Sequence, residues 1–371
     1  MVKKVVIAAG GTGGHIYPAI ALADALKKEN SDINIHFIGS DERLEKDLIP
    51  QAGYPITTIP VRQFSISSIS KFFKGGISLL KSYIKSKKFL KDFSPDVVIG
   101  VGSYISVPPI IAGFHCKIPI VLLEQNVIPG KANLFLSKFA KVVAVSFESS
   151  KKFFSRNEVI VTGNPIRLDF INMKDRNTAG ELIGINPEKY TIVIIGGSQG
   201  AQSINNAVIN DLPQFLQNTD YQIIHITGTK NYDEILEKTK IYTEEYPRRY
   251  ILYPYYNDMA TIFSCTDLAI TRGGATTISE LCSCGIPMII IPYIYSKGHQ
   301  IQNAFEIIKK EGGIIINEEE LKKGKLFDTV YDVINSTEKF QKMKNNCLNL
   351  GNKYAAFKVA QIILNCCNNK N

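Results

Sequence analysis

The chain lacks a hydrophobic run long enough to cross a membrane. Its longest nearly uncharged apolar stretch, from Ile286 to Tyr295, has ten residues, about half of what a bilayer-spanning helix needs. At the amino terminus, glycines interrupt the apolar segment MVKKVVIAA before it reaches the length of a secretory signal. We therefore expect no transmembrane helix and no signal peptide, and a protein that stays in the cytoplasm.

The chain also lacks the common metal-binding patterns. It has no Asp-x-Asp pair and no His-x-x-x-His. Its seven cysteines form an odd set without paired spacing, which is typical of reduced thiols. Cys282 and Cys284 are two apart in a predicted helix, so they do not share a face. We expect no metal site.

Acidic residues are missing from one long segment. None occurs between Leu48 and Lys91, which holds eight Lys and Arg. Residues 1–168 carry 22 Lys and Arg against 12 Asp and Glu, whereas the rest of the chain is nearly neutral. A basic block of this length attracts polyanions.

The basic segment also contains an apolar stripe. Phe73, Ile77, Leu80 and Ile84 recur at steps of four, three and four residues, which predicts one face of a helix. Such a face packs on a domain core with its lysines in water, or it lies on an anionic membrane surface. The pattern alone favours core packing. Since no helix-turn-helix or aromatic RNA-binding motif accompanies the charge, we expect no nucleic-acid partner.

What is present indicates a two-domain α/β protein. The 371 residues are 45% hydrophobic and 21% charged, as in globular proteins that can fill two cores. Apolar β-branched runs alternate with helical patterns throughout, for example VVIAA at Val5 and TIVIIGG at Thr191. This alternation predicts parallel sheets covered by helices. The turn-rich break TGNPIR, residues 162–167, divides the chain into two similar halves.

Each half opens with a strand, a glycine-rich turn and a helix. The turns are GGTGGH from Gly10 and GGSQGA from Gly196. Backbone N–H groups at such a helix start can hold an anion, although glycines there can equally serve tight packing. Neither turn ends in Lys-Ser/Thr and neither fits GxGxxG, which disfavours nucleoside triphosphate hydrolysis and dinucleotide binding.

Three side chains near predicted loops are candidate functional residues. His15 can accept a proton near neutral pH, or merely bind phosphate or pack. Arg167 could bind phosphate oxygens, or it could form an ordinary salt bridge. Glu280, one to two turns into the helix after Gly273 and Gly274, could take the vicinal hydroxyls of a ribose, or cap or bridge within its own domain. Because ligands of open α/β sheets bind beyond the carboxyl ends of strands, we expect a cleft between the two domains.

Seven motifs occur in order along nearly the whole chain. They are GGTGGH from Gly10, LEQN from Leu123, TGNPIR from Thr162, GGSQGA from Gly196, YYNDM from Tyr255, RGGATTISE from Arg272 and HQIQNA from His299. Together they resemble the MurG family of GT-B glycosyltransferases, bacterial enzymes that add N-acetylglucosamine to the lipid-linked muramyl-pentapeptide precursor of peptidoglycan.

The resemblance implies an α/β GT-B fold, in which two Rossmann-like doubly wound parallel-sheet domains face each other across a cleft. Residues 1–162 would form the acceptor- and membrane-binding domain, joined by a C-terminal helix at about 352–371. Residues 163–351 would form the domain that binds the UDP-sugar donor.

The resemblance also implies site residues, with His15 and Glu280 in the catalytic set. The implied UDP-N-acetylglucosamine contacts are Thr12, Gly13, Gly14, Asn126, Arg167, Ser198, Tyr256, Ala275, Thr276, Thr277, Ile278, Ser279, Glu280, Gln300 and Asn303. The implied acceptor contacts are Gly11, Thr12, Gly13, Gly14, His15, Tyr104 and Asn126. With a lipid acceptor, membrane docking becomes the favoured interpretation of the stripe, through Phe72, Phe73, Ile77, Leu80, Lys81, Lys85 and Lys88.

The implied reaction is an inverting transfer from UDP-N-acetylglucosamine to an undecaprenyl-linked acceptor. His15 is the candidate base, and a role in holding pyrophosphate stays open. No tightly bound cofactor is implied, although a divalent cation could stimulate the reaction. The implied location is the cytoplasmic face of the bacterial cell membrane, as a peripheral protein, and other cell-wall synthesis proteins could be partners.

Two departures from the family pattern concern these sites. Many members have a second glycine before the tyrosine that follows Gly102, whereas this chain has Ser103, followed by Val107 and Pro108, so acceptor contacts there are in doubt. His299 stands at a variable position. Rival interpretations are a glycolipid synthase that uses diacylglycerol, a non-catalytic nucleotide-sugar-binding subunit, and an epimerase acting on the same donor.

Overall fold

The computed structural model describes residues 2–41, 44–62, 69–154, 158–197, 200–296 and 298–368, without the side chains of residues 69–74, 367 and 368. The chain forms two compact units. The first contains Met1–Leu168 and Lys353–Asn371, and the second contains Asp169–Asn352. The chain therefore leaves the first unit six residues beyond the boundary expected at residue 162, and it returns through its carboxyl-terminal segment.

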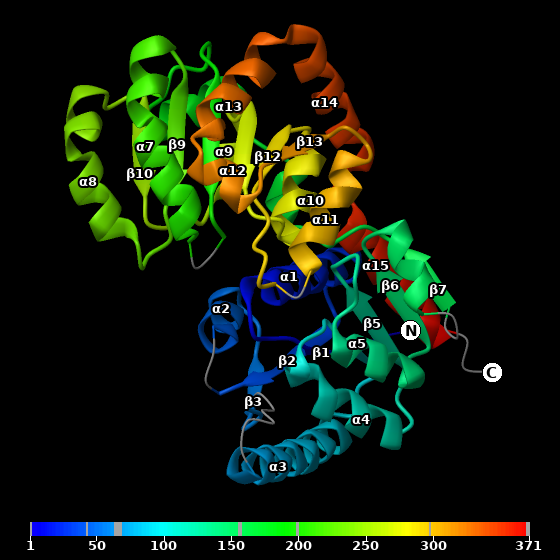
Figure 1. The fold of residues 1–371 in the computed structure, drawn as a ribbon. Coiled ribbons are helices and arrows are strands. Elements are labelled where there is room, and N and C mark those ends of the chain that lie inside the picture. Colours follow the sequence, from blue (N-terminus) through cyan, green and yellow to red (C-terminus); the bar gives the residue numbers. More distant parts are fainter. Residues whose placement is uncertain are drawn as a thin grey trace. The chain divides into compact units, whose positions relative to one another are not determined.

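The first unit is built on a seven-stranded parallel sheet with the order β3-β2-β1-β4-β5-β6-β7 (Figure 1). Its strands are β1 (Lys4–Ala8), β2 (Asn34–Ser40), β3 (Ile56–Ile59), β4 (Val97–Gly100), β5 (Ile120–Glu124), β6 (Val142–Val145) and β7 (Glu158–Val161). Its helices are α1 (Gly13–Glu29), α2 (Glu45–Gln51), α3 (Ile69–Phe93), α4 (Val107–His115), α5 (Lys131–Leu136) and α15 (Ala355–Asn368), with short 3-10 helices η1 (Tyr104–Ser106), η2 (Ser137–Phe139) and η3 (Glu148–Phe153).

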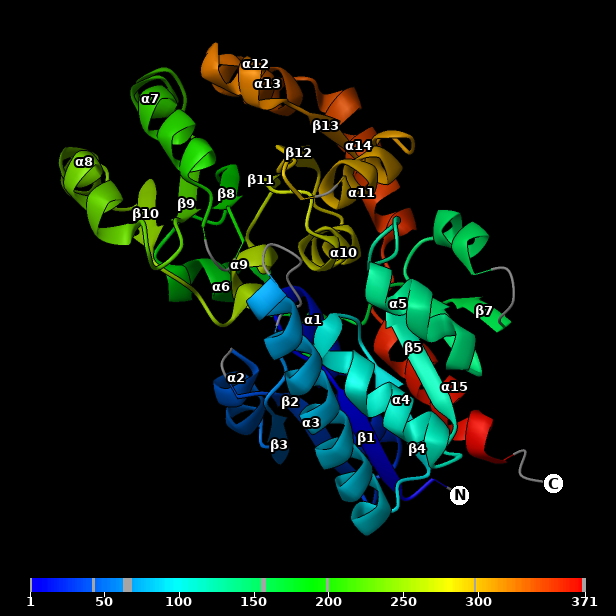
Figure 2. The ribbon, with the colours of Figure 1, turned by 60° about the horizontal axis from the view of Figure 1, so that its bottom comes forward.

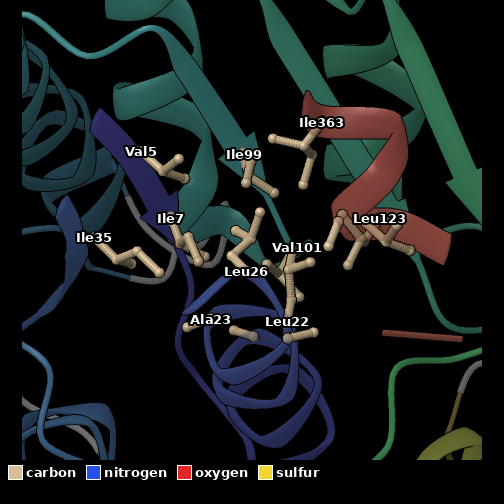
Figure 3. Close-up of a cluster of buried hydrophobic side chains, with 14 of the residues drawn as sticks. Val5, Ile7, Leu22, Ala23, Leu26, Ile35, Ile99, Val101, Leu123 and Ile363 are labelled. Carbon is tan, nitrogen blue, oxygen red and sulfur yellow. The ribbon is translucent and has the colours of Figure 1, made fainter. Parts of the chain in front are cut away.

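Helices α1 and α15 pack against the sheet of this unit. Strands β4 and β5 are buried along their whole length, as expected of apolar strands covered on both faces. Figure 3 shows Val5 and Ile7 of β1 with Leu22 and Leu26 of α1 in the buried cluster that also contains Ile363 of α15. The last helix therefore completes the core of the unit in which the chain begins.

The second unit is built on a six-stranded parallel sheet with the order β10-β9-β8-β11-β12-β13. Its strands are β8 (Thr191–Ile195), β9 (Gln222–Ile226), β10 (Tyr250–Tyr253), β11 (Leu268–Thr271), β12 (Met288–Ile290) and β13 (Gly313–Ile315). Its helices are α6 (Arg176–Ile183), α7 (Gln202–Asn218), α8 (Tyr232–Glu245), α9 (Met259–Ser264), α10 (Ala275–Cys284), α11 (His299–Ile308), α12 (Glu318–Lys322), α13 (Lys325–Asn335) and α14 (Thr337–Leu350), and η4 (Leu168–Phe170) lies at the boundary between the units.

The expectation of two doubly wound parallel sheets is confirmed. Each sheet grows outward in both directions from its first strand, β1 or β8, so each has a switch point beside that strand. All carboxyl ends of parallel strands lie at one edge of a sheet. The loops after β1, β4 and β5 therefore share an edge of the first unit, and the loops after β8, β11 and β12 share an edge of the second.

Candidate active site

The first glycine loop joins β1 to α1. A Cβ placed on Gly10 would overlap the Glu45 carboxylate, and Gly11 has φ +101°, so neither position accommodates a side chain readily. Thr12 and Gly14 are exposed at the start of α1. The loop therefore presents the amino-terminal end of a 17-residue helix to an anion.

Glu45 supports this loop from beneath, and sequence reasoning missed it. Its buried carboxylate accepts hydrogen bonds from the Gly11 amide at 3.1 Å, the Ser40 amide at 3.0 Å and the Ser40 hydroxyl at 2.5 Å. It thereby ties the loop after β1 to the end of β2. The available signal was an acidic residue shortly after a predicted strand, which did not distinguish Glu45 from its acidic neighbours.

His15 lies in the first turn of α1, between Thr12 and Gly102. Its Nδ1 is 3.2 Å from the Thr12 hydroxyl. A Cβ placed on Gly102 would lie 3.0 Å from the imidazole Cδ2, so the ring contacts the loop after β4 closely. With a hydrogen on Nδ1 donated to Thr12, Nε2 is the nitrogen that accepts a proton.

The loop after β4 carries Tyr104 and the departures from the family pattern. Tyr104 begins η1 and is half-buried. Val107 begins α4 and Pro108 follows it, where the missing proline N–H costs no helical hydrogen bond. Both residues are therefore compatible with the helix start, while Ser103 has an unusual backbone conformation, φ +68°.

Asn126 is positioned by Glu124, a buried acid at the end of β5. One carboxylate oxygen accepts the Asn126 amide at 3.0 Å and its side-chain Nδ2 at 3.3 Å. The other accepts the Gly130 amide at 3.0 Å and Asn133 Nδ2 at 2.9 Å. Burial raises the pKa of Glu124, and these four donors oppose that shift. One side chain therefore fixes the whole turn from residue 124 to residue 133.

Arg167 lies near the end of the first unit. Its guanidinium stands 5.3 Å from the ring centre of Tyr17 on α1, within cation–π distance. The first unit thus holds Arg167 against the same helix that carries Gly13, Gly14 and His15.

The second glycine loop follows β8. A Cβ on Gly196 would overlap the Ala201 amide, and one on Gly200, at φ +75°, would overlap the Thr227 carbonyl. Both positions therefore require glycine. Ser198, an implied diphosphate contact, lies outside the described residues.

Two amide side chains hold the loop after β11. Gln300 Oε1 accepts the Gly273 amide at 3.2 Å and the Tyr293 amide at 2.9 Å. Asn303, fully buried, donates from Nδ2 to the Gly273 carbonyl at 3.0 Å. The structure therefore brings the implied sugar contacts Gln300 and Asn303 together around the loop that begins α10. Because its carbonyl oxygen is committed to backbone amides, Gln300 offers a ligand its NH₂ group.

Helix α10 places the remaining implied donor contacts in two groups. The side chains of Ala275 and Ile278 are buried, and the Ile278 amide donates to the Gly274 carbonyl, so a donor contact at either residue stays a prediction. Glu280 is buried, with 5% of its surface exposed. The side chains of Thr276, Thr277 and Ser279 are partly exposed.

Tyr256 lies in the loop after β10. Its ring centre is 4.8 Å from that of Tyr253, and burial raises its pKa. Next to it, Asp258 caps α9 and accepts a hydrogen bond from Lys174 at 3.1 Å. The loop is thereby fixed to the segment before α6.

The apolar stripe on α3 is exposed rather than packed in the core. Ile77, Leu80 and Ile84 are 55%, 59% and 58% exposed, and we call these three residues the α3 apolar face. The opposite side of α3, with the buried Ser82 and Ser86, packs beside α4 (Figure 2). The core-packing interpretation is therefore wrong for this face. Lys81, Lys85 and Lys88 are exposed beside it, and the side chains of Phe72 and Phe73 lie outside the described residues.

Membrane-spanning helices and clusters of metal ligands are both absent from the described residues. None of the helices among them combines the length and apolar character that spanning a bilayer takes. Within the same part of the chain, no three His, Cys, Asp or Glu side chains cluster as metal ligands would.

Both halves of the chain match models of one protein family. Residues 5–145 match the glycosyltransferase family 28 N-terminal domain, and residues 191–362 match the glycosyltransferase family 28 C-terminal domain. The first matched segment contains strands β1 to β6 of the first sheet, apart from the first residue of β1, and the second contains all strands of the second sheet.

Individual proteins extend this similarity over nearly the whole length. The chain is 35% identical over 361 residues to a UDP-N-acetylglucosamine--N-acetylmuramyl-(pentapeptide) pyrophosphoryl-undecaprenol N-acetylglucosamine transferase of Halalkalibacterium halodurans, covering 97% of this chain and 98% of that protein. The crystal structure of Acinetobacter baumannii MurG superposes with a TM-score of 0.77 at 24% identity, covering 98% and 99% of the two chains, which confirms the GT-B fold. A putative UDP-N-acetylglucosamine 2-epimerase from Listeria monocytogenes shares this fold, with a TM-score of 0.70 at 16% identity and coverage of 97% and 95%.

Proposed function

Because the chain belongs to glycosyltransferase family 28, we propose that it transfers N-acetylglucosamine from UDP-N-acetylglucosamine to the muramyl sugar of undecaprenyl-pyrophosphoryl-MurNAc-pentapeptide, the step that makes lipid II for peptidoglycan. The observation that carries the proposal is identity of 35% along 97% of the chain to a transferase of that name. Sharing the fold alone would not decide it, because an epimerase shares that fold and folds host many functions.

The donor binds mainly to the second unit in this proposal. Glu280 takes the ribose hydroxyls, and the backbone near Tyr256 takes the uracil. The second glycine loop, with Ser198, takes the diphosphate, together with Arg167 of the first unit. Gln300 faces the sugar, with its NH₂ group donating to a sugar oxygen, and Asn126 contributes from the first unit. The glycines that shape the second loop and the Gln300 bonds to the Gly273 loop support this assignment.

The acceptor's pyrophosphate binds at the first glycine loop in this proposal. The muramyl hydroxyl then attacks the anomeric carbon of the donor while UDP leaves from the opposite face, which inverts the configuration. His15 Nε2 takes the hydroxyl proton. Negative charge that grows on the leaving diphosphate is stabilised by loop N–H groups, the helix dipole and Arg167. No tightly bound metal is needed for this stabilisation, although a divalent cation could add to it.

The protein works as a peripheral protein at the cytoplasmic face of the membrane in this proposal. Its acceptor keeps a polyprenyl tail in the bilayer, so the site must approach the lipid surface. The exposed α3 apolar face and its flanking lysines support this docking, since apolar insertion and cationic attraction to anionic lipids add together. Other cell-wall synthesis proteins are proposed partners at that surface.

An acceptor-dependence assay tests the proposed function. Purified protein is incubated with radiolabelled UDP-N-acetylglucosamine, with and without the lipid-linked muramyl acceptor, and with diacylglycerol in a third arm. Label should enter lipid only with the muramyl acceptor. Label in diacylglycerol would identify a glycolipid synthase. Chemical change of the donor in the absence of any acceptor would identify an epimerase. Binding of the donor without turnover would identify a non-catalytic subunit. Glu280→Ala and His15→Ala should each abolish most of the transfer, and an active Glu280→Ala would contradict the donor site.

A further inference from the structure

Ser103 adopts a backbone conformation that favours glycine. It has φ +68° and ψ 156° in the loop between β4 and η1, directly after Gly102 at φ +93°. A side chain at such a φ contacts its own backbone. Residues held this way persist only where the surrounding structure fixes them, and they concentrate at functional sites.

The loop around Ser103 is fixed from both sides. The buried Ser106 hydroxyl lies within hydrogen-bond distance of two carbonyl oxygens, that of Gly102 at 2.5 Å and that of Ala8 at the end of β1 at 3.0 Å. The Ser106 amide donates to the Ser103 carbonyl at 3.2 Å. A glycine at position 103 would adopt the same conformation without strain, so backbone geometry gives no reason for a serine here.

The Ser103 hydroxyl lies over the first glycine loop. A Cβ placed on Gly11 would be 3.1 Å from Ser103 Oγ, and the residue is half-buried, so a ligand on the loop can reach it. The oxygen accepts the Ile105 amide at 3.5 Å, a role that leaves the hydroxyl hydrogen to be donated. The Gly11 amide itself donates to Glu45, so the hydroxyl supplies a donor where the loop's own amide is committed.

We propose that Ser103 is a further binding residue for a sugar-linked diphosphate, and that its hydroxyl donates a hydrogen bond to a phosphate oxygen of the acceptor's pyrophosphate on the first glycine loop. The inference rests on the proposed function, because that function supplies the acceptor. The donor carries a diphosphate too, and the test therefore measures the two substrates separately.

The test compares Ser103→Ala, which keeps the Cβ and removes the hydroxyl, with Ser103→Gly, which removes both. Ser94→Gly is the matched control, because Ser94 is a second serine at positive φ, +52°, exposed just after α3. Steady-state kinetics on the full-length protein give KM for the acceptor and for UDP-N-acetylglucosamine. Thermal unfolding gives the midpoint of each variant.

Both Ser103 variants should raise KM for the acceptor by about 10- to 150-fold, the loss expected for one hydrogen bond to a charged group, and leave KM for UDP-N-acetylglucosamine unchanged. Ser103→Gly should raise the unfolding midpoint above that of Ser103→Ala. Ser94→Gly should change only the midpoint. An unchanged acceptor KM in Ser103→Ala would overturn the inference, and so would a rise confined to UDP-N-acetylglucosamine.

A binding measurement separates this inference from the proposed function. Calorimetry with a short prenyl diphosphate, in the absence of UDP-N-acetylglucosamine, should show weaker binding to Ser103→Ala than to the unmodified protein by a similar factor. Equal affinities would overturn the role of Ser103 even if the enzyme transfers sugar as proposed. Conversely, the protein could lack transferase activity and still bind the prenyl diphosphate more tightly than Ser103→Ala does. The diphosphate contact would then stand, and the proposed function would be wrong.

Discussion

Arg272 and Glu318 form a largely buried ion pair at the edge of the second sheet, with Arg272 Nη1 2.7 Å from Glu318 Oε1. The same guanidinium donates to the Ile291 carbonyl at 2.9 Å and to the Ser203 hydroxyl at 2.8 Å. The Ser203 hydroxyl donates in turn to Glu318 at 3.0 Å. One cation therefore links the ends of β11 and β12, the start of α7 and the start of α12, next to the loop that begins α10.

Glu318→Gln should weaken donor binding through this network. The change leaves the Arg272 charge without its counter-charge, which we expect to cost about 3 kcal/mol of stability and to raise KM for UDP-N-acetylglucosamine about tenfold, since the Gly273 loop loses its fixed position. Steady-state kinetics and thermal unfolding measure both effects. Glu319→Gln, exposed on the same helix, is the control. If stability falls while KM stays the same, the pair supports the fold and not the site.

Gly102→Ala should impair the reaction through His15. The new methyl group would lie 3.0 Å from the imidazole at a φ of +93°, which costs roughly 1–3 kcal/mol of backbone strain and displaces the ring. We expect kcat/KM for the acceptor to fall at least about tenfold, because a displaced base loses its alignment with the attacking hydroxyl.

The control for this variant is Gly130→Ala, where no atom lies within 4 Å of the added carbon and φ is −62°. Its kinetics should match those of the unmodified protein. Full activity in a folded Gly102→Ala would show that the position of the His15 ring is not critical.

The sequence predicts those features of this molecule that depend on local geometry. Both glycine loops were expected from a strand followed by glycines and a helix, and the structure explains the glycines by overlap with Glu45, Ala201 and Thr227. The period of the α3 apolar face was visible, but its exposure was not, because periodicity shows that a face exists and not what covers it.

The supporting carboxylates could not be predicted in the same way. Glu45 reaches Gly11 across 34 residues and Glu318 reaches Arg272 across 46. Such contacts depend on which loops share a sheet edge, and therefore on strand order, which no local pattern specifies. The domain boundary is also only partly predictable. The turn-rich TGNPIR segment marks a break in the pattern, but packing decides that the first unit continues to Leu168.

His225 should make the second unit sensitive to acid. Its fully buried ring bonds Tyr250 Oη through Nδ1 and Asn205 Oδ1 through Nε2, each at 3.0 Å, and burial lowers its pKa to about 3. Between pH 6.5 and about 3 the unfolded chain therefore binds a proton that the folded chain does not, so stability falls as the pH falls. From pH 7.5 to pH 5 the loss is about 2 kcal/mol.

His225→Gln should flatten this dependence, even though the variant starts less stable. The measurement is the free energy of opening of the second unit, obtained from hydrogen exchange between pH 5 and pH 7.5. His115→Gln, an exposed position in the first unit, should keep the original slope. An unchanged slope in His225→Gln would assign the acid sensitivity to other groups.

Removal of divalent cations should leave most of the activity. Backbone amides, the helix dipole and Arg167 are proposed to stabilise the leaving diphosphate, so EDTA should lower kcat by less than about twofold. Activity that disappears with EDTA and returns with Mg²⁺ would show that a metal carries this role. If a metal carries this role, the activity of Arg167→Ala should depend more on added Mg²⁺ than that of the unmodified protein, because the cation would replace the lost charge.

Charge reversal beside the α3 apolar face should abolish membrane docking. Each lysine near an anionic surface contributes about 1 kcal/mol, so changing Lys81, Lys85 and Lys88 to Glu should weaken binding to anionic vesicles by about 100-fold or more. The control reverses three exposed lysines of the second unit, Lys322, Lys339 and Lys344, which gives the same net charge. Vesicle co-sedimentation should separate the two variants at equal salt. If both bind alike, net charge rather than α3 governs attraction, and unchanged binding of the α3 variant would refute docking through this helix.

The double variant Ile77→Ser with Leu80→Ser completes the test of docking. It should weaken binding to the vesicles without altering the dependence of binding on salt, as expected if the α3 apolar face inserts into the bilayer surface.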